Sequence, residues 1–215
     1  MGFGRKRIYF LKVLATCGWL LIYGNVFADE AADINNSFNE YKKSIVRTNS
    51  LQAVGLVSQS TIDYYSAAKK LALTAKADKL KRLPFSQKMF VLTLRMRMSK
   101  SKLQSMDGRE LFMHAVSSGW ISKSSVENSA LGKVRITGNT AYVDYVNKGK
   151  PSKTQFVFVK ENGVWKFDLV SVMNEADKLF TAAAHRANVS EDKMVETLIE
   201  KATGRKVTPA LWNGF

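Results

Sequence analysis

The chain has 215 residues, with 33 lysines and arginines against 18 aspartates and glutamates, which gives a net charge of +15 at pH 7. This length suits one domain whose core is large enough to be stable without cross-links. One cysteine and two histidines exclude a disulfide framework and a zinc site built on several thiolates or imidazoles.

The N-terminus has the pattern of a secretory signal peptide. A basic run at residues 5–7 precedes an apolar segment at 13–23, and small or apolar side chains lead up to Ala28. A retained membrane anchor is the alternative, but Lys12 interrupts the apolar run and the remainder is shorter than the roughly 20 residues of a spanning helix. We therefore expect residues 1–28 to be removed and the mature protein to be periplasmic or secreted.

The positive charge is concentrated in one stretch. Twelve lysines and arginines lie between Lys69 and Arg109, against two aspartates. In an exported protein such a face suits peripheral contact with an anionic membrane surface, a cell-envelope polymer or an acidic protein, and we expect no nucleic-acid partner. The alternative is a solvated helix face that only aids solubility. The residues proposed for this basic face are Lys79, Lys81, Arg82, Arg95 and Arg97.

The first element after the signal peptide is an amphipathic helix. It is expected from Ala31 to near Arg47, and a short helical turn follows at 51–57. Its apolar stripe consists of Ile34, Phe38, Tyr41 and Ile45, which recur at helical spacing.

A longer helix is predicted next, with Ser58 or Ser60 as its N-cap. It carries two adjacent tyrosines, Tyr64 and Tyr65. Their rings are apolar and their hydroxyls need a partner when buried. Further along, Ser86 stands after a proline in the position of another N-cap.

The segment 89–98 fits both a helix and a strand. Its methionine-rich composition favours the helix, and its methionines are expected to fill a core rather than bind a metal. Asp107 then caps a helix over 108–118. Within this helix, His114 is either a catalytic base or a packing residue. Trp120, which follows the helix, either forms the wall of a pocket or packs in the core.

Four consecutive strands are predicted between Gly132 and Val170. Apolar and polar residues alternate along each, and glycine-containing turns at 138–139 and 161–163 connect them. Alternation of this kind predicts an antiparallel meander with one buried face, which the flanking helices should cover.

Helices follow the sheet. One starts at Ser171 or Asn174, and Ser190 caps a second over 191–202, which Gly204 ends. The tail that contains Trp212 is apolar enough to pack onto the domain, and the alternative is a partner-binding segment.

Three segments carry a family resemblance: LVSQSTIDYY at 56–65, GNTAYVDY at 138–145 and KENGVWKFDL at 160–169. Helices followed by a meander with these segments resemble the nuclear transport factor 2-like (SnoaL-like) superfamily. The resemblance implies an α+β cone in which N-terminal helices pack against a curved antiparallel sheet and a pocket opens between them. It divides the chain into that domain at 29–173 and an additional helical extension at 174–215.

The resemblance also implies a site and an assembly. Relatives that are enzymes use a carboxylate inside the cone, for which Asp63, Asp144 and Asp168 are the available acids. Homodimerisation through the sheet is common in the superfamily. The ligand-pocket candidates are Tyr64, Tyr65, His114, Trp120, Tyr142 and Asp168.

Three functions remain open from the sequence. The leading one is a non-catalytic exported binding protein that holds a small apolar ligand or an acidic partner, with no cofactor, no metal and no catalytic residue. The second is a small pocket enzyme, an isomerase, dehydratase or hydrolase, with Asp168 or Asp63 as its base. The third is an accessory subunit of an envelope assembly. Fold alone does not decide among them.

Overall fold

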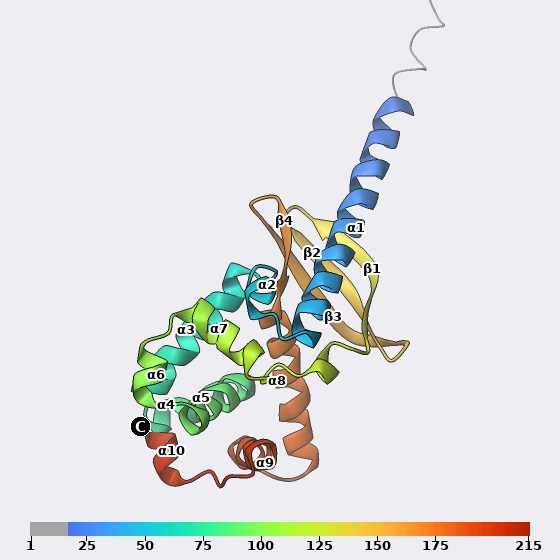
Figure 1. The fold of residues 1–215 in the computed structure, drawn as a ribbon. Helices are drawn as coiled ribbons and strands as arrows, with labels where there is room; N and C mark the ends of the chain where they lie inside the picture. The colour runs from blue at the N-terminus through green and yellow to red at the C-terminus, as the bar shows by residue number, and fades with distance from the viewer. Residues whose placement is uncertain (1–16) are drawn as a thin grey trace, which may run out of the picture.

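The computed structural model describes residues 17–215, and their side chains from Asp29 on. These residues form an α+β protein, as predicted, in which ten α-helices and one short 3-10 helix accompany a four-stranded antiparallel sheet. Figure 1 shows the sheet and helix α1 at one end of the molecule and most of the other helices at the opposite end.

Helix α1 runs over Cys17–Val46 and continues through Ala28 without a break. Residues 1–16, the first part of the predicted signal peptide, lie outside the described residues. The N-terminal part of α1 projects away from the rest of the chain (Figure 1). Within the described part of the chain, no helix combines the length and the apolar character that crossing a membrane requires.

The C-terminal half of α1 packs on the sheet, against β4 and β1. The predicted apolar stripe is confirmed, because all four of its side chains are exposed by 2 % or less. Phe38 lies against rings from two strands, with centroids 5.7 Å from Phe156 and 5.6 Å from Phe167. The stripe therefore forms the helical side of the main core.

The sheet is the predicted meander. Its neighbouring strands pair antiparallel in the order β1-β2-β3-β4. Gly138 and Gly163 adopt the positive φ angles of 57° and 79° that the two predicted turns require. Trp165 is 2 % exposed, so the last strand faces the core as expected. The strands are β1 (Ser129–Thr137), β2 (Thr140–Asn147), β3 (Lys150–Glu161) and β4 (Val164–Asp168).

Two irregularities bend the sheet. The β1–β2 register shifts between Leu131 and Val134, and the β2–β3 register shifts between Asp144 and Val146. At the first shift β1 has one extra residue and at the second β3 has two, and extra residues in one strand increase the local twist and bend the ladder. The inner face of the curved sheet can therefore wrap around the C-terminal half of α1.

The outer edge of β4 is covered by the chain that precedes α3. Phe167 donates its backbone N–H to the carbonyl of Leu56 at 2.9 Å and accepts from the N–H of Ser58 at 3.0 Å. This short parallel bridge uses backbone groups that an open edge strand would leave unpaired.

The helices between α1 and the sheet match most of the predictions. Ser58 caps α3, and Asp107 forms a capping box with Glu110 at the start of α7. The ambiguous segment 89–98 lies mostly in a helix, as predicted. These elements are α2 (Ser50–Val54), α3 (Gln59–Thr74), α4 (Ala77–Lys81), α5 (Phe85–Arg97), α6 (Lys100–Gln104), α7 (Gly108–Ser117) and the 3-10 helix η1 (Lys123–Ser125).

Three helices follow the sheet: α8 (Leu169–Arg186), α9 (Glu191–Thr203) and α10 (Pro209–Asn213). Helix α8 begins before the predicted Ser171 or Asn174, because the carboxylate of Asp168 accepts from the N–H of Val170 and acts as the N-cap. Ser190 and Gly204 bound α9 as predicted.

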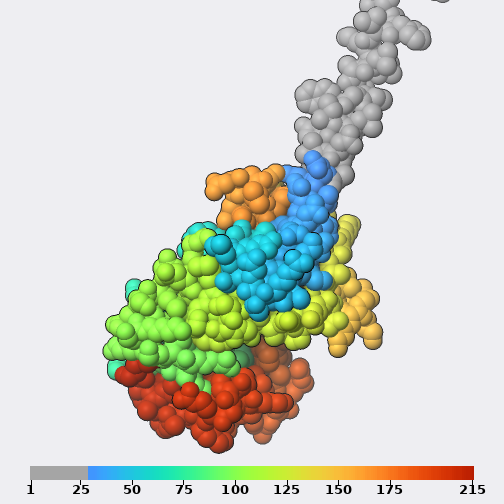
Figure 2. All heavy atoms as spheres, viewed as in Figure 1, coloured from blue at the N-terminus to red at the C-terminus, as the bar shows by residue number. Residues whose placement is uncertain are grey.

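The C-terminal tail is docked, because Trp212 is only 5 % exposed. In Figure 2 the C-terminal helices, coloured red, form the end of the molecule opposite α1. The prediction that the tail packs onto the domain is therefore confirmed, and the packing partners lie in α4 and α5.

The predicted cap at Ser86 is wrong. Helix α5 begins at Phe85, and its N-cap position is Pro84, which has no side-chain acceptor. The carboxylate of Asp177 in α8 supplies the acceptor instead: the backbone N–H of Ser86 donates to Oδ1 at 2.5 Å and its hydroxyl donates to Oδ2 at 3.2 Å. Local sequence could not indicate this cap, since the acceptor lies 91 residues away.

Candidate functional site

A cavity of about 180 Å³ lies between the inner face of the sheet and the helices. Helices α1 and α3, strands β3 and β4, the start of α8 and the segment around η1 contribute to its wall. Most of the lining side chains are aromatic or aliphatic. They are Phe38, Tyr41, Tyr65, Ile121, Val126, Phe156, Phe167, Leu169, Val172 and Met173, together with Ser125 and Ser129.

The aromatic part of the wall is built by two periodicities. Phe38 and Tyr41 lie on one face of α1 because they are three residues apart, and Phe156 and Phe167 point inward because side chains alternate along their strands. The Tyr41 ring meets the Phe167 ring edge-on at 5.3 Å. Edge-on and tilted ring contacts of this kind hold aromatic walls in a defined geometry.

Two phenol groups of the wall have no hydrogen-bond partner. Tyr41 is 1 % exposed and Tyr65 is 4 % exposed. Neither hydroxyl forms a hydrogen bond to any group of the described part of the chain. Within the same part, Trp165 Nε1 is the one side-chain polar atom that is both completely buried and without a hydrogen-bond partner. Each phenol oxygen therefore keeps a small accessible surface, and both side chains line the cavity.

Both phenols are neutral. Burial raises the pKa of Tyr41 well above its ordinary value of 10.0. Burial is also the largest cause of the raised pKa of Tyr65, and the nearby hydroxyls of Tyr41 and Tyr64 add to it. Both side chains line the same cavity, Tyr41 from α1 and Tyr65 from α3.

The two serines of the wall are already paired. The hydroxyl of Ser125 donates to the carbonyl of Ser122 at 2.6 Å, and the hydroxyl of Ser129 donates to the carbonyl of Ser125 at 3.2 Å. Among the lining side chains of residues 29–215 there is no carboxylate, imidazole, ammonium or guanidinium group. Among the lining side chains of the described residues, the two phenols are therefore the polar groups without a partner.

The predicted pocket residues are scattered. Tyr65 lines the apolar cavity. Tyr64 lies beside it in sequence, but its hydroxyl donates to Ser86 Oγ at 3.3 Å and its ring stacks on Phe90. The structure thus separates the two adjacent tyrosines into one cavity residue and one packing residue.

His114 and Trp120 pair with each other outside this cavity, with ring centroids 5.3 Å apart. Burial is the main cause that lowers the pKa of His114, and the charge of Lys102 adds to it. The guanidinium of Arg97 lies 5.6 Å from the Trp120 ring centroid. This cluster joins α5 to the end of α7 by aromatic and cation–π contacts.

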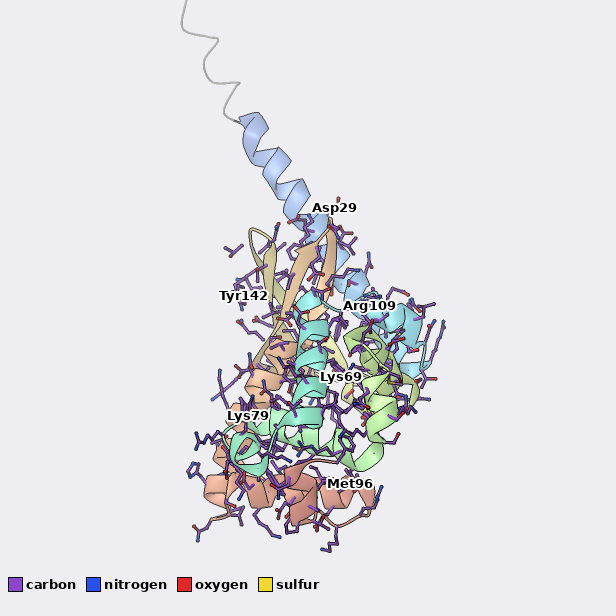
Figure 3. All side chains as sticks on the ribbon, turned by 90° about the vertical axis from the view of Figure 1, so that its left-hand side faces the viewer. Asp29, Lys69, Lys79, Met96, Arg109 and Tyr142 are labelled. Atoms are coloured by element: carbon purple, nitrogen blue, oxygen red, sulfur yellow. The ribbon has the colours of Figure 1, made fainter. Side chains whose placement is uncertain are left out.

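Tyr142 lies on the outer face of the sheet, where it is 44 % exposed (Figure 3). It borders a second, polar depression of about 370 Å³ that also includes Lys153 and Gln155 of β3 and Glu175 and Lys178 of α8. The structure therefore places Tyr142 and Tyr65 in different cavities.

None of the three predicted acids lines the apolar cavity. Asp168 caps α8 and accepts hydrogen bonds from Ser60 at 2.9 Å and Ser58 at 3.3 Å. Asp144 pairs with an arginine on the outer sheet face, with 2.6 Å between the two groups. Asp63 is exposed and accepts from a glutamine on its own helix. Each carboxylate thus has a structural partner away from the aromatic wall.

Arg95 does not belong to an exposed basic face, so that prediction is wrong. It is 5 % exposed. Its guanidinium donates to five backbone carbonyls, at the end of α3 and in α10, because the folded chain brings these acceptors together around it. The acceptors are Leu71, Ala72, Ala75, Leu211 and Trp212.

The remaining basic-face residues, Lys79, Lys81, Arg82 and Arg97, are exposed. Figure 3 shows Lys69, Lys79 and Arg109 at separate levels along the helical part of the molecule. The positive charge that is contiguous in sequence is therefore spread along the helical part, and the segment 76–82, which contains α4, has four basic residues against Asp78.

Sequence reasoning missed Tyr41 as a site residue, although it placed Tyr41 correctly in the apolar stripe of α1. A tyrosine in an apolar stripe has the same pattern whether its hydroxyl is paired or faces a cavity. In the described part of the chain no group of histidine, cysteine, aspartate and glutamate is arranged to hold a metal ion. Comparisons with protein-family models, with curated proteins and with solved structures find no match to this chain.

Proposed function

We propose that this chain is an exported binding protein that holds a small apolar molecule in the cavity beneath its sheet. The observation that carries this proposal is the cavity wall, in which aromatic and aliphatic side chains line a space of about 180 Å³. Concave, mostly apolar sites with a few placed polar groups are the usual form of small-molecule sites.

Binding is favoured over catalysis by the positions of the acids. A general base must lie within hydrogen-bond reach of the proton that it removes. Asp63 and Asp168, the bases of the alternative enzyme hypothesis, are outside the lining of the cavity, and Asp168 is occupied as a helix cap. The proposed activity is therefore retention of a ligand without a chemical step.

The proposed fold family is the nuclear transport factor 2-like superfamily. Three features support it: helices precede a four-stranded meander, the sheet bends at two register shifts, and the cavity lies between the sheet and α1. In this proposal α8, α9 and α10 extend the family cone.

Export of the protein rests on the signal-peptide pattern of residues 1–28. Cleavage after Ala28 would leave Asp29 and Glu30 in the first turn of α1, where carboxylates stabilise a helix. Glu30 also pairs with Lys160 of β3 at 2.5 Å. We expect N-terminal sequencing of the exported protein to begin at Asp29, whereas a chain that keeps residues 13–23 after export would contradict this step.

The exposed basic residues support a second role, contact with an anionic envelope surface. The test is sedimentation with vesicles that contain phosphatidylglycerol or only phosphatidylcholine. We expect binding to the anionic vesicles that weakens with salt and is lost when Lys79, Lys81 and Arg82 are all changed to glutamate. Equal sedimentation with both vesicle types would remove this role.

The cavity proposal is tested with α-methylstyrene, an apolar molecule built on one ring, by ligand-observed NMR. Ile121→Trp adds volume to the wall, and we expect it to weaken binding by at least about tenfold through overpacking of the site. Leu51→Trp, at a position that is 75 % exposed, is the matched control and should leave binding unchanged. A wild-type protein that binds neither this compound nor polar compounds of the same shape would overturn the proposal.

A further inference from the structure

The unpaired phenols of Tyr41 and Tyr65 set a limit on what the cavity holds. In folded proteins nearly all buried polar side-chain atoms have a hydrogen-bond partner, since an unpaired one costs free energy. Here two such groups, from α1 and α3, border the same cavity and have no partner in the described part of the chain. Their arrangement indicates that the cavity is shaped for an occupant that carries its own polar atom.

The charge of that occupant follows from the uncharged side chains that line the cavity. No lysine, arginine or histidine from Asp29 onward lines the cavity, and burial keeps the two phenols neutral in the physiological range. An anionic ligand would lose its hydration without gaining a cation, and a cationic ligand would find no carboxylate. The occupant is therefore neutral.

The size of the occupant follows from the volume. A cavity of about 150 Å³ lined by aliphatic and aromatic side chains accommodates benzene. The cavity of this protein has about 180 Å³, which leaves room for one ring and a short substituent.

We propose that the hydroxyls of Tyr41 and Tyr65 form a polar subsite that binds the oxygen atom of a neutral, ring-sized ligand, with a carbonyl compound as the best fit. A carbonyl oxygen has two lone pairs and accepts two hydrogen bonds, so both phenols can donate to the same atom. The aromatic wall contacts the apolar remainder of the ligand. This inference rests on the proposed binding function and specifies the ligand class.

The test measures the affinities of three compounds of nearly the same shape. The protein is purified from cells that express the full chain. Acetophenone carries a carbonyl oxygen, α-methylstyrene carries a methylene group in its place, and benzoate carries a negative charge. We expect acetophenone to bind about 2- to 10-fold more tightly than α-methylstyrene, the range of a net hydrogen-bond contribution, and benzoate to bind most weakly.

Two substitutions remove one hydroxyl each and keep the ring: Tyr41→Phe and Tyr65→Phe. We expect each to weaken acetophenone binding and so reduce its preference over α-methylstyrene, and the double variant to abolish that preference. Tyr64→Phe is the matched control, since that hydroxyl donates to Ser86 and does not line the cavity. It should leave the preference unchanged.

The outcomes separate the two proposals. Equal binding of acetophenone and α-methylstyrene by the wild type would leave the cavity as a binding site but overturn the phenol subsite. This is the result expected if the two phenols hold only a water molecule. If benzoate binds most tightly of the three, the inference that the ligand is neutral is overturned. Failure of all three compounds to bind would overturn the proposed function itself.

Discussion

Lys88 on α5 and Asp192 on α9 form an ion pair in which the ammonium lies 2.9 Å from Oδ1. Glu191 adds a second carboxylate at 3.1 Å. The lysine side chain is 4 % exposed, whereas the two carboxylates are 32 % and 30 % exposed. A residue from the basic stretch is thus used to attach α9 to α5.

Because the lysine is buried and the two carboxylates are partly exposed, removing the carboxylates should lower the free energy of unfolding more than removing the lysine. The double variant Glu191→Gln and Asp192→Asn leaves a buried ammonium unpaired, and we expect it to lose about 3 kcal/mol of unfolding free energy. Lys88→Met leaves carboxylates that water can reach, and we expect a loss below about 1.5 kcal/mol. Urea unfolding measures both. Glu175→Gln, in the exposed pair with Lys178, should change stability by less than about 0.5 kcal/mol. Equal losses for the first two variants would contradict this account.

The pH dependence of this contact follows from Glu191. A hydrogen bond from Thr181 is the largest cause that lowers its pKa below 4.5, burial opposes it, and Lys88 adds to it. A lowered folded-state pKa contributes stability above pH 4.5 that is lost as the pH falls through the folded-state value. The stability difference between wild type and Glu191→Gln should therefore shrink as the pH is lowered from 7 to below about 4.

Thr181→Ala is the companion variant for the pH experiment. It removes the largest cause of the lowered pKa of Glu191. In the Thr181→Ala background, the stability difference between Glu191 and Glu191→Gln should therefore depend less on pH. Stability differences that stay constant across this pH range in denaturant titrations would show that Glu191 does not titrate with folding.

Gly108 marks the close crossing of α7 over α3. A Cβ atom at this position would lie 2.6 Å from the carbonyl oxygen of Ile62 and closer still to Ser66 Oγ. We expect Gly108→Ala to destabilise the protein by about 1–3 kcal/mol, because the backbone carbonyl cannot move away as a side chain can.

Gly55→Ala is the control for Gly108→Ala. Its Cβ would have its nearest contact at 3.4 Å, and its φ angle of −74° suits alanine. The expected change is neutral or a gain of up to about 1 kcal/mol. Thermal and urea unfolding measure both variants, and a Gly108→Ala protein as stable as the wild type would mean that the two helices can separate without cost.

Arg95 attaches the C-terminal helix α10 to the rest of the protein through its hydrogen bonds. A lysine cannot reproduce the planar set of donors that reaches carbonyls in both α3 and α10. We expect Arg95→Lys to lose about 2 kcal/mol and to speed tryptic cleavage at Arg205 and Lys206. Arg82→Lys, at an exposed position, should do neither. Unchanged cleavage in Arg95→Lys would show that α10 is held by its apolar contacts alone.

The sequence predicted the four strands and the longer helices, but not the short helices α4, α6 and α10. Period-two alternation located the strands, and glycine turns set their connections, because both depend on residues close together in the chain. Most caps followed for the same reason: Ser58, Asp107 and Ser190 bond to backbone groups within three residues. The cap at Ser86 failed because its acceptor, Asp177, comes from another helix.

The tertiary structure alone decided the roles of polar residues within those elements. Tyr64 and Tyr65 are neighbours in sequence, yet one hydroxyl donates to Ser86 and the other borders the cavity. Arg95 and Arg97 lie on the same helix, yet only Arg95 is surrounded by backbone carbonyls. Local periodicity determines which face of an element is buried, whereas the partner of a buried polar atom depends on groups that folding brings from distant positions.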